Sequence, residues 1–97
     1  MQQAAFHIII NLKTCSGFES FGKFFIGNNR ESARFIFSKL KGKQRVSEKN
    51  VLHLDLIETN NGLPVNMQMI SCSLEELAEN CKIITREAFK LFNLEEK

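Results

Sequence analysis

The fold is decided by residues 51–76, VLHLDLIETNNGLPVNMQMISCSLEE. Apolar and polar residues alternate through residues 51–58, which is the period of a half-buried strand. The Asn-Asn-Gly at residues 60–62 follows, and Asn-Gly tolerates the positive φ that a tight hairpin needs. After a second strand, Ser73 and Glu76 have the spacing of a capping box. The stretch therefore predicts a strand, a hairpin, a second strand and the start of a helix, which we expect to run to about residue 92.

The first half of the chain repeats this pattern with weaker signals. Residues 6–13 alternate as a strand, and residues 19–26 form a second strand with phenylalanine on both faces. Asn28 stands three residues before Glu31, which is an asparagine variant of the capping box. Gly42 suits the left-handed position that closes a helix. The chain therefore contains the ββα pattern twice.

This repeat predicts one domain over residues 1–97, with halves at about 5–42 and 50–93. The helix between the second and third strands makes those two strands parallel, so they are not neighbours in an antiparallel sheet. The simplest sheet order is 2-1-3-4, with both helices packed on one face. We predict an α+β two-layer sandwich with ββαββα topology and a four-stranded antiparallel sheet.

Composition is that of an ordinary globular domain. Of the 97 residues, 43% are hydrophobic and 25% are charged. The longest apolar run is too short to cross a bilayer, and the N-terminus lacks the basic residues of a secretory signal. Three cysteines without a C-x-x-C spacing indicate free thiols in a reducing compartment. We therefore expect a cytoplasmic protein with no membrane partner.

One face of the predicted sheet has no helix over it, and it carries several large apolar residues. Such a patch is larger than scattered surface exposure gives, and a symmetric dimer would cover it. The alternative is a bulge in the second strand that turns its phenylalanines inward. The predicted interface residues are Ile9, Phe21, Phe25, Ile57 and Ile70.

No constellation in the sequence predicts catalysis. His53 and Asp55 share a strand face, but nothing nearby completes a triad. His7 occupies the matching position in the first half, yet antiparallel neighbours place the two histidines towards opposite ends, so they could meet only across a dimer. Glycine-rich phosphate loops, H-E-x-x-H and serine-nucleophile motifs are absent. The sequence therefore predicts no enzyme, cofactor or metal.

Charge is divided unevenly between the halves. Residues 1–50 carry nine Lys or Arg and three Glu, whereas residues 51–97 carry four Lys or Arg and eight Asp or Glu. A basic half with exposed phenylalanine would suit nucleic acid, although the net charge of only +2 argues against it. The candidate contacts for nucleic acid are Lys23, Arg30, Arg34, Lys39, Lys41, Lys43, Arg45 and Lys49.

Residues 51–65 and 77–92 resemble small bacterial proteins with no assigned activity, and the resemblance covers most of the chain. It implies a stand-alone cytoplasmic domain, and it supplies no activity, cofactor or site. The leading hypothesis from the sequence is a non-enzymatic interaction module that forms a homodimer or binds a further protein through the open sheet face. The alternative hypothesis is a nucleic-acid-binding protein that uses the basic first half.

Overall fold

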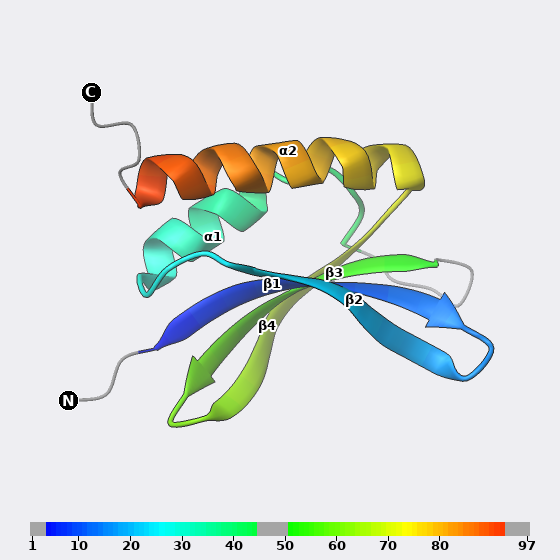
Figure 1. Ribbon diagram of the computed structural model, residues 1–97, viewed down its shortest axis with the longest axis horizontal. Coiled ribbons are helices and arrows are strands. Elements are labelled where there is room, and N and C mark those ends of the chain that lie inside the picture. Colours follow the sequence, from blue (N-terminus) through cyan, green and yellow to red (C-terminus); the bar gives the residue numbers. More distant parts are fainter. Residues whose placement is uncertain (1–3, 45–50, 93–97) are drawn as a thin grey trace.

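The computed structural model describes residues 4–44 and 51–92 of the chain. Its elements follow the order ββαββα, and the four strands form one antiparallel sheet in the order β2-β1-β3-β4. Both helices lie on the same side of the sheet, the upper side in Figure 1. The predicted fold class and strand order are confirmed. The elements are β1 (Ala5–Thr14), β2 (Gly17–Phe25), α1 (Arg30–Ser38), β3 (Leu52–Asn60), β4 (Leu63–Cys72) and α2 (Leu74–Leu91).

The central strands β1 and β3 join the two halves of the chain. Their alternating residues point to opposite faces, so one register defines both surfaces of the sheet. On the helix side, Ile8 lies opposite Leu56 and Ile10 opposite Leu54. On the other side, which we call the open face, His7 lies opposite Ile57, Ile9 opposite Asp55 and Asn11 opposite His53.

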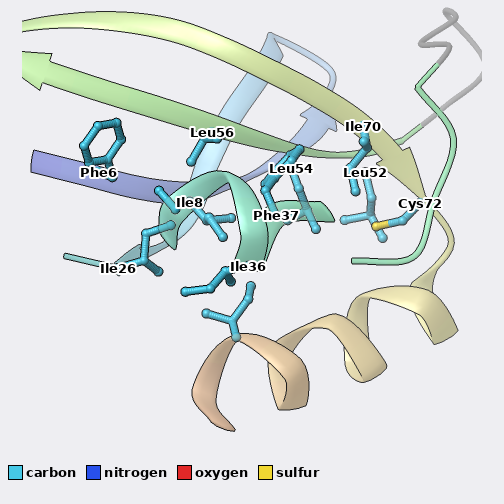
Figure 2. Close-up of a cluster of buried hydrophobic side chains, with 12 residues drawn as sticks. Phe6, Ile8, Ile26, Ile36, Phe37, Leu52, Leu54, Leu56, Ile70 and Cys72 are labelled. Atoms are coloured by element: carbon cyan, nitrogen blue, oxygen red, sulfur yellow. The ribbon is translucent and has the colours of Figure 1, made fainter. Parts of the chain in front are cut away.

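The hydrophobic core lies between the sheet and the helices (Figure 2). Ile8, Leu54 and Leu56 are fully buried, and each side chain of this size contributes about 1.5–3 kcal/mol when it leaves water. Helix α1 supplies Ala33, Ile36 and Phe37, whereas α2 supplies Ile84 and packs Leu77 against the core. The core residues are Phe6, Ile8, Ile26, Ala33, Ile36, Phe37, Leu52, Leu54, Leu56, Ile70, Cys72 and Ile84.

The start of α2 matches its prediction, whereas the start of α1 differs by one residue. Ser73 Oγ accepts from the backbone N–H of Glu76, whose carboxylate accepts from the backbone N–H of Ser73. For α1 the N-cap is Asn29, which accepts from the backbone N–H of Ser32 at 2.8 Å. Asn28 instead donates to the backbone carbonyl of Ala4 at 2.7 Å. Two adjacent asparagines offered the same capping chemistry, and only the path of the chain distinguishes them.

A bulge in β4 reverses the faces that alternation predicts for its second half. The register with β3 shifts between Leu56 and Ile57, which leaves Met67 as the extra residue. One inserted residue moves every later side chain to the opposite face. Ile70 therefore points into the core and is 8% exposed, while Met69 faces the open side. The prediction of Ile70 as an interface residue is wrong for this reason.

A second bulge lies in β2, where the register with β1 shifts between Ile10 and Asn11. Phe21 is the extra residue, and its side chain is 61% exposed. The predicted alternative of a bulge in this strand is thus confirmed, but the bulge does not turn Phe21 inward. Phe24 points to the helix side, where it packs against the core.

The segment after α1 attaches to the edge of β4. The helix ends at Ser38, earlier than Gly42, the predicted stop. Gly42 has a φ of +155°, and a Cβ there would lie 2.5 Å from the carbonyl oxygen of Ser71, so the close approach requires glycine. Next to it, Lys43 and Ser71 exchange two backbone hydrogen bonds of 2.8 Å.

The side chain of Asn80 holds the same segment from α2. Its Oδ1 accepts from the backbone N–H of Lys41 at 2.7 Å, and its Nδ2 donates to the backbone carbonyl of Lys41 at 2.8 Å. Asn80 is fully buried, so no water can replace these bonds if they are lost. The amide therefore ties the connector between the halves to the second helix.

Replacing Asn80 with alanine is expected to lower the free energy of unfolding by about 2–4 kcal/mol, because two buried hydrogen bonds disappear together. Urea unfolding followed by circular dichroism measures the change. Asn28→Ala is the matched control: it removes one exposed hydrogen bond and should cost under about 1 kcal/mol. Equal losses for the two variants would contradict the role assigned to Asn80.

Candidate functional site

The open face is the surface of the sheet opposite the helices. Among the described residues, no element packs across it (Figure 1). Its side chains nevertheless include residues that are largely hidden from solvent, namely His53 at 6% and Asp55 at 9% exposure. The face therefore combines buried polar groups with half-exposed apolar ones.

A short polar network crosses three strands of this face. Asn11 Nδ2 donates to Asp55 Oδ2 at 2.9 Å, and Ser20 Oγ donates to Asn11 Oδ1 at 2.9 Å. The bulge at Phe21 makes this possible, because it brings Ser20 directly opposite Asn11. The hydrogen bond between Asn11 and Asp55 depends on the β1–β3 register, which places these two residues close together on the same face. The network is thus a product of strand pairing.

His53 lies at one end of this network beneath an aromatic ring. Phe18 stacks on its imidazole with ring centroids 4.3 Å apart and an interplanar angle of 27°. The contact explains why His53 is buried on an uncovered face. Phe18 lies just before the predicted start of the second strand, so alternation alone did not place it on this surface.

The buried polar atoms without a hydrogen-bond partner share one location. Within residues 4–44 and 51–92, these atoms are Nδ1 of His7, Nε2 of His53 and Oδ1 of Asp55. All belong to open-face residues of β1 and β3. Buried polar groups in folded proteins are nearly always paired, so each exception needs water or a further partner. This face therefore has unmet hydrogen-bonding capacity.

Burial dominates the electrostatics of these groups. It raises the pKa of the Asp55 carboxyl above its ordinary value, although the charge of His53 and the amides of Asn66 and Asn11 oppose the rise. Asn66 lies close enough to act on the carboxyl, but Oδ1 has no partner in good hydrogen-bond geometry. Burial also lowers the pKa values of His7 and His53. The face thus disfavours charge on all three groups.

The arrangement does not assemble a metal site or a catalytic pair. His7 and Asn11 are four residues apart on β1, and Asn11 lies opposite His53. The two histidines are therefore separated by about 13 Å along the strands, at ~3.3 Å per residue. No group of three or more His, Cys, Asp or Glu that could hold a metal occurs in the described parts of the chain.

The predicted interface residues lie in four different places. Ile9 and Ile57 lie at the centre of the open face and are partly buried. Phe25 lies at its corner, 5.3 Å from the ring of His7 and 5.6 Å from that of Phe92. Phe21 is exposed at the bulge and Ile70 is in the core. Phe18 and Met69, which belong to the face, were missed because the bulges are invisible in the sequence.

The predicted nucleic-acid contacts do not form one surface. Arg30 donates to Glu58 at 2.8 Å, and Lys39 donates to Glu87 at 3.0 Å. Lys23 lies on the open face of β2, whereas Arg34 lies on α1 at the opposite side of the sheet. Lys41 and Lys43 belong to the connector; residues 45 and 49 (Arg and Lys) lie outside the described residues. Nucleic-acid binding therefore stays a prediction, and the described members of this set give it no continuous basic site.

The three cysteines are unpaired and differ in exposure. Cys15 is exposed in the first hairpin, Cys81 is half-buried on α2 and Cys72 is buried in the core. Burial, reinforced by the charge of Glu76, raises the pKa of the Cys72 thiol to about 11. Cys81 is thus more accessible than Cys72 and less accessible than Cys15.

Comparisons with protein-family models, curated proteins and solved structures found no match to this chain. The resemblance to small bacterial proteins therefore stays a prediction. In the described part of the chain, no helix is long and apolar enough to cross a membrane. The candidate site rests on the geometry of the open face itself.

Stability is expected to fall as the pH drops from about 7.5 to about 5.5. The folded-state pKa values of His7 and His53 lie below 6.5, so the unfolded chain binds more protons in that window. Nearby Lys23 and Lys13 add to the effect, whereas Asp55 opposes it at His53. Urea unfolding at both pH values measures it.

In the same experiment, the double variant His7→Gln, His53→Gln should lose most of this pH dependence. The Asp55 carboxyl has the opposite sign, because its raised pKa makes the folded protein bind more protons. The contribution of Asp55 to stability therefore changes at acidic pH, beginning near 3.8, which is the ordinary pKa of this group. Above that pH, stability from Asp55 falls as the pH rises. An unchanged pH dependence in the double variant would show that other groups control it.

Alkylation should distinguish the cysteines. Iodoacetamide at about pH 8 is expected to modify Cys15 first and to leave Cys72 unmodified, because a buried thiol with a raised pKa forms little thiolate. Peptide mass spectrometry after timed quenching measures the order. In denaturant the two sites should react at similar rates. Rapid native modification of Cys72 would contradict its burial.

Proposed function

We propose that this protein is a non-enzymatic, cytoplasmic protein-interaction module that forms a symmetric dimer through its open face. One observation carries the proposal: the unpartnered buried atoms of His7, His53 and Asp55 all lie on the uncovered side of the sheet. A covering layer would give them partners. The unpaired cysteines support a reducing compartment.

A second copy of the chain is the occupant that fits this chemistry. Asp55 Oδ1 is an acceptor, and the ring nitrogens of His7 and His53 can donate, so the face carries complementary groups. A two-fold axis brings the same patch of both copies together, which lets each copy supply what the other lacks. Around these groups, Ile9, Ile57, Phe18 and Met69 supply apolar surface.

An interaction role fits His53 and Asp55 better than catalysis. The Phe18 ring covers the imidazole, and Nε2 is buried, so a substrate could not reach that atom without displacing the ring. A general base must lie within hydrogen-bond reach of the proton it removes. A surface that packs over the whole face has enough contact area to displace this ring, and the pair then provides directional contacts to it.

Multi-angle light scattering at micromolar concentration tests the dimer. Wild-type protein should have the mass of two chains, and Ile57→Lys should have the mass of one, because a charge would be buried at the centre of the interface. Met69→Lys should give the same result at a side chain that is 37% exposed and so less important for folding.

Val65→Lys is the matched control for these variants. Val65 lies on the same strand as Met69 and is 57% exposed, but it pairs with Glu58 on the helix side of the sheet. This variant should remain dimeric. A monomeric wild type, or equal dissociation by Val65→Lys and Met69→Lys, would overturn the proposed interface.

A further inference from the structure

We propose that the free edge of β2 and the groove beside α2 bind an extended acidic peptide, which adds to the sheet as a fifth strand. This site adjoins the open face at Lys23 and Phe25, whereas its other lining residues on α2 lie outside that face. It combines three features that lie together at one corner of the molecule: an unpaired strand edge, an aromatic groove and a set of cations.

The first feature is the edge of β2. In the order β2-β1-β3-β4, both β2 and β4 are edge strands. The edge of β4 is interrupted near both ends, because Lys43 pairs with Ser71 there and Pro64 lacks an N–H. Among described residues, nothing pairs with the outer side of β2. Its N–H and C=O groups are available to an added strand.

The second feature is a groove of 330 Å³ between the end of β2 and the second half of α2. Phe24 and Phe25 come from the strand, and Phe89 and Phe92 come from the end of the helix. Phe89 is 58% exposed, so its ring is accessible to a bound segment. Side chains of an added strand would alternate, so every second one could enter this groove.

The third feature is the charge around the groove. A neighbouring hollow on α2 shares Thr85 and Phe89 with it. Together the two hollows are lined by four cations, Lys23, Lys82, Arg86 and Lys90, and by no described carboxylate. Glu87 lies 3.7 Å from Lys90 but already binds Lys39 at 3.0 Å. The surplus of positive charge specifies a partner with acidic residues.

These features favour a peptide over a nucleic acid. Phosphates would also meet the cations, and bases could stack on phenylalanine. However, a nucleic acid cannot continue the ladder of backbone hydrogen bonds at the edge of β2, whereas an extended peptide can. The site therefore fits an extended segment in which acidic and apolar residues alternate.

A synthetic ten-residue peptide of alternating Glu and Val with one central Trp provides the probe. The chain has no Trp or Tyr, so tryptophan fluorescence reports the peptide alone. We expect saturable binding that weakens as salt is added. The same peptide with Lys in place of Glu should bind at least about 10-fold more weakly. N-methylation of alternate amides should cause a similar loss, because it removes the donors that pair with β2.

Two variants and a control locate the site. Phe89→Ala should weaken binding at least about 10-fold, as for an anchor at the centre of an interface. The double variant Lys82→Glu, Arg86→Glu should bind the Lys peptide better than the Glu peptide. Phe35→Ala is the matched control, because Phe35 is also 58% exposed but lies on α1, and binding should change less than about 2-fold.

Several outcomes would overturn the proposal. One is no binding at millimolar peptide in low salt, and another is equal loss in the Phe35 and Phe89 variants. Full affinity of the N-methylated peptide would exclude strand addition. If single-stranded RNA binds the same site more tightly than the Glu peptide does, nucleic acid is the partner. If the wild type is a dimer and the Phe89→Ala variant is a monomer, a second copy of the chain occupies the groove. Failure of the open-face dimer would leave this result interpretable, because the variants that test the groove, at Phe89, Lys82 and Arg86, lie on α2 and not on the open face.

Discussion

The antiparallel pairing of β1 with β3 is the constraint on which the rest of the structure depends. These strands come from different halves of the chain and form the centre of the sheet. Because side chains alternate along a strand, a single register aligns Ile8 and Leu56 beneath the helices and Asn11 and His53 on the open face. A shift by one residue would exchange the apolar core with the polar network.

Polar side chains fix the positions of the connector and the helices, which apolar packing alone does not define. Asn80 is fully buried and binds both backbone groups of Lys41, so it fixes the connector against α2. Glu87 is also buried and binds Lys39, which links the ends of the two helices. Apolar contacts are non-directional, whereas hydrogen bonds require one geometry. These contacts therefore select one arrangement among many that would bury similar apolar area.

The two surfaces proposed for binding follow from the same sheet. The open face exists because both helices pack on one side, and the β2 edge is free because the sheet ends there. The polar centre of the open face suits a complementary copy of itself. The aromatic and cationic corner beside α2 suits a different partner, because its lining residues include no described carboxylate. One small domain therefore offers two adjoining contact surfaces, which meet at Lys23 and Phe25.

The sequence by itself determined the element order and the capping box at Ser73, because periodicity and turn chemistry act locally. It also determined the strand order, because the helix between the second and third strands leaves few possible topologies. Only the tertiary structure decided that Ile70 enters the core and Met69 leaves it, since a bulge has no reliable local signal. It also brought Ser20 to Asn11 and Phe18 to His53. Such contacts join residues distant in the sequence, and strand pairing alone defines their partners.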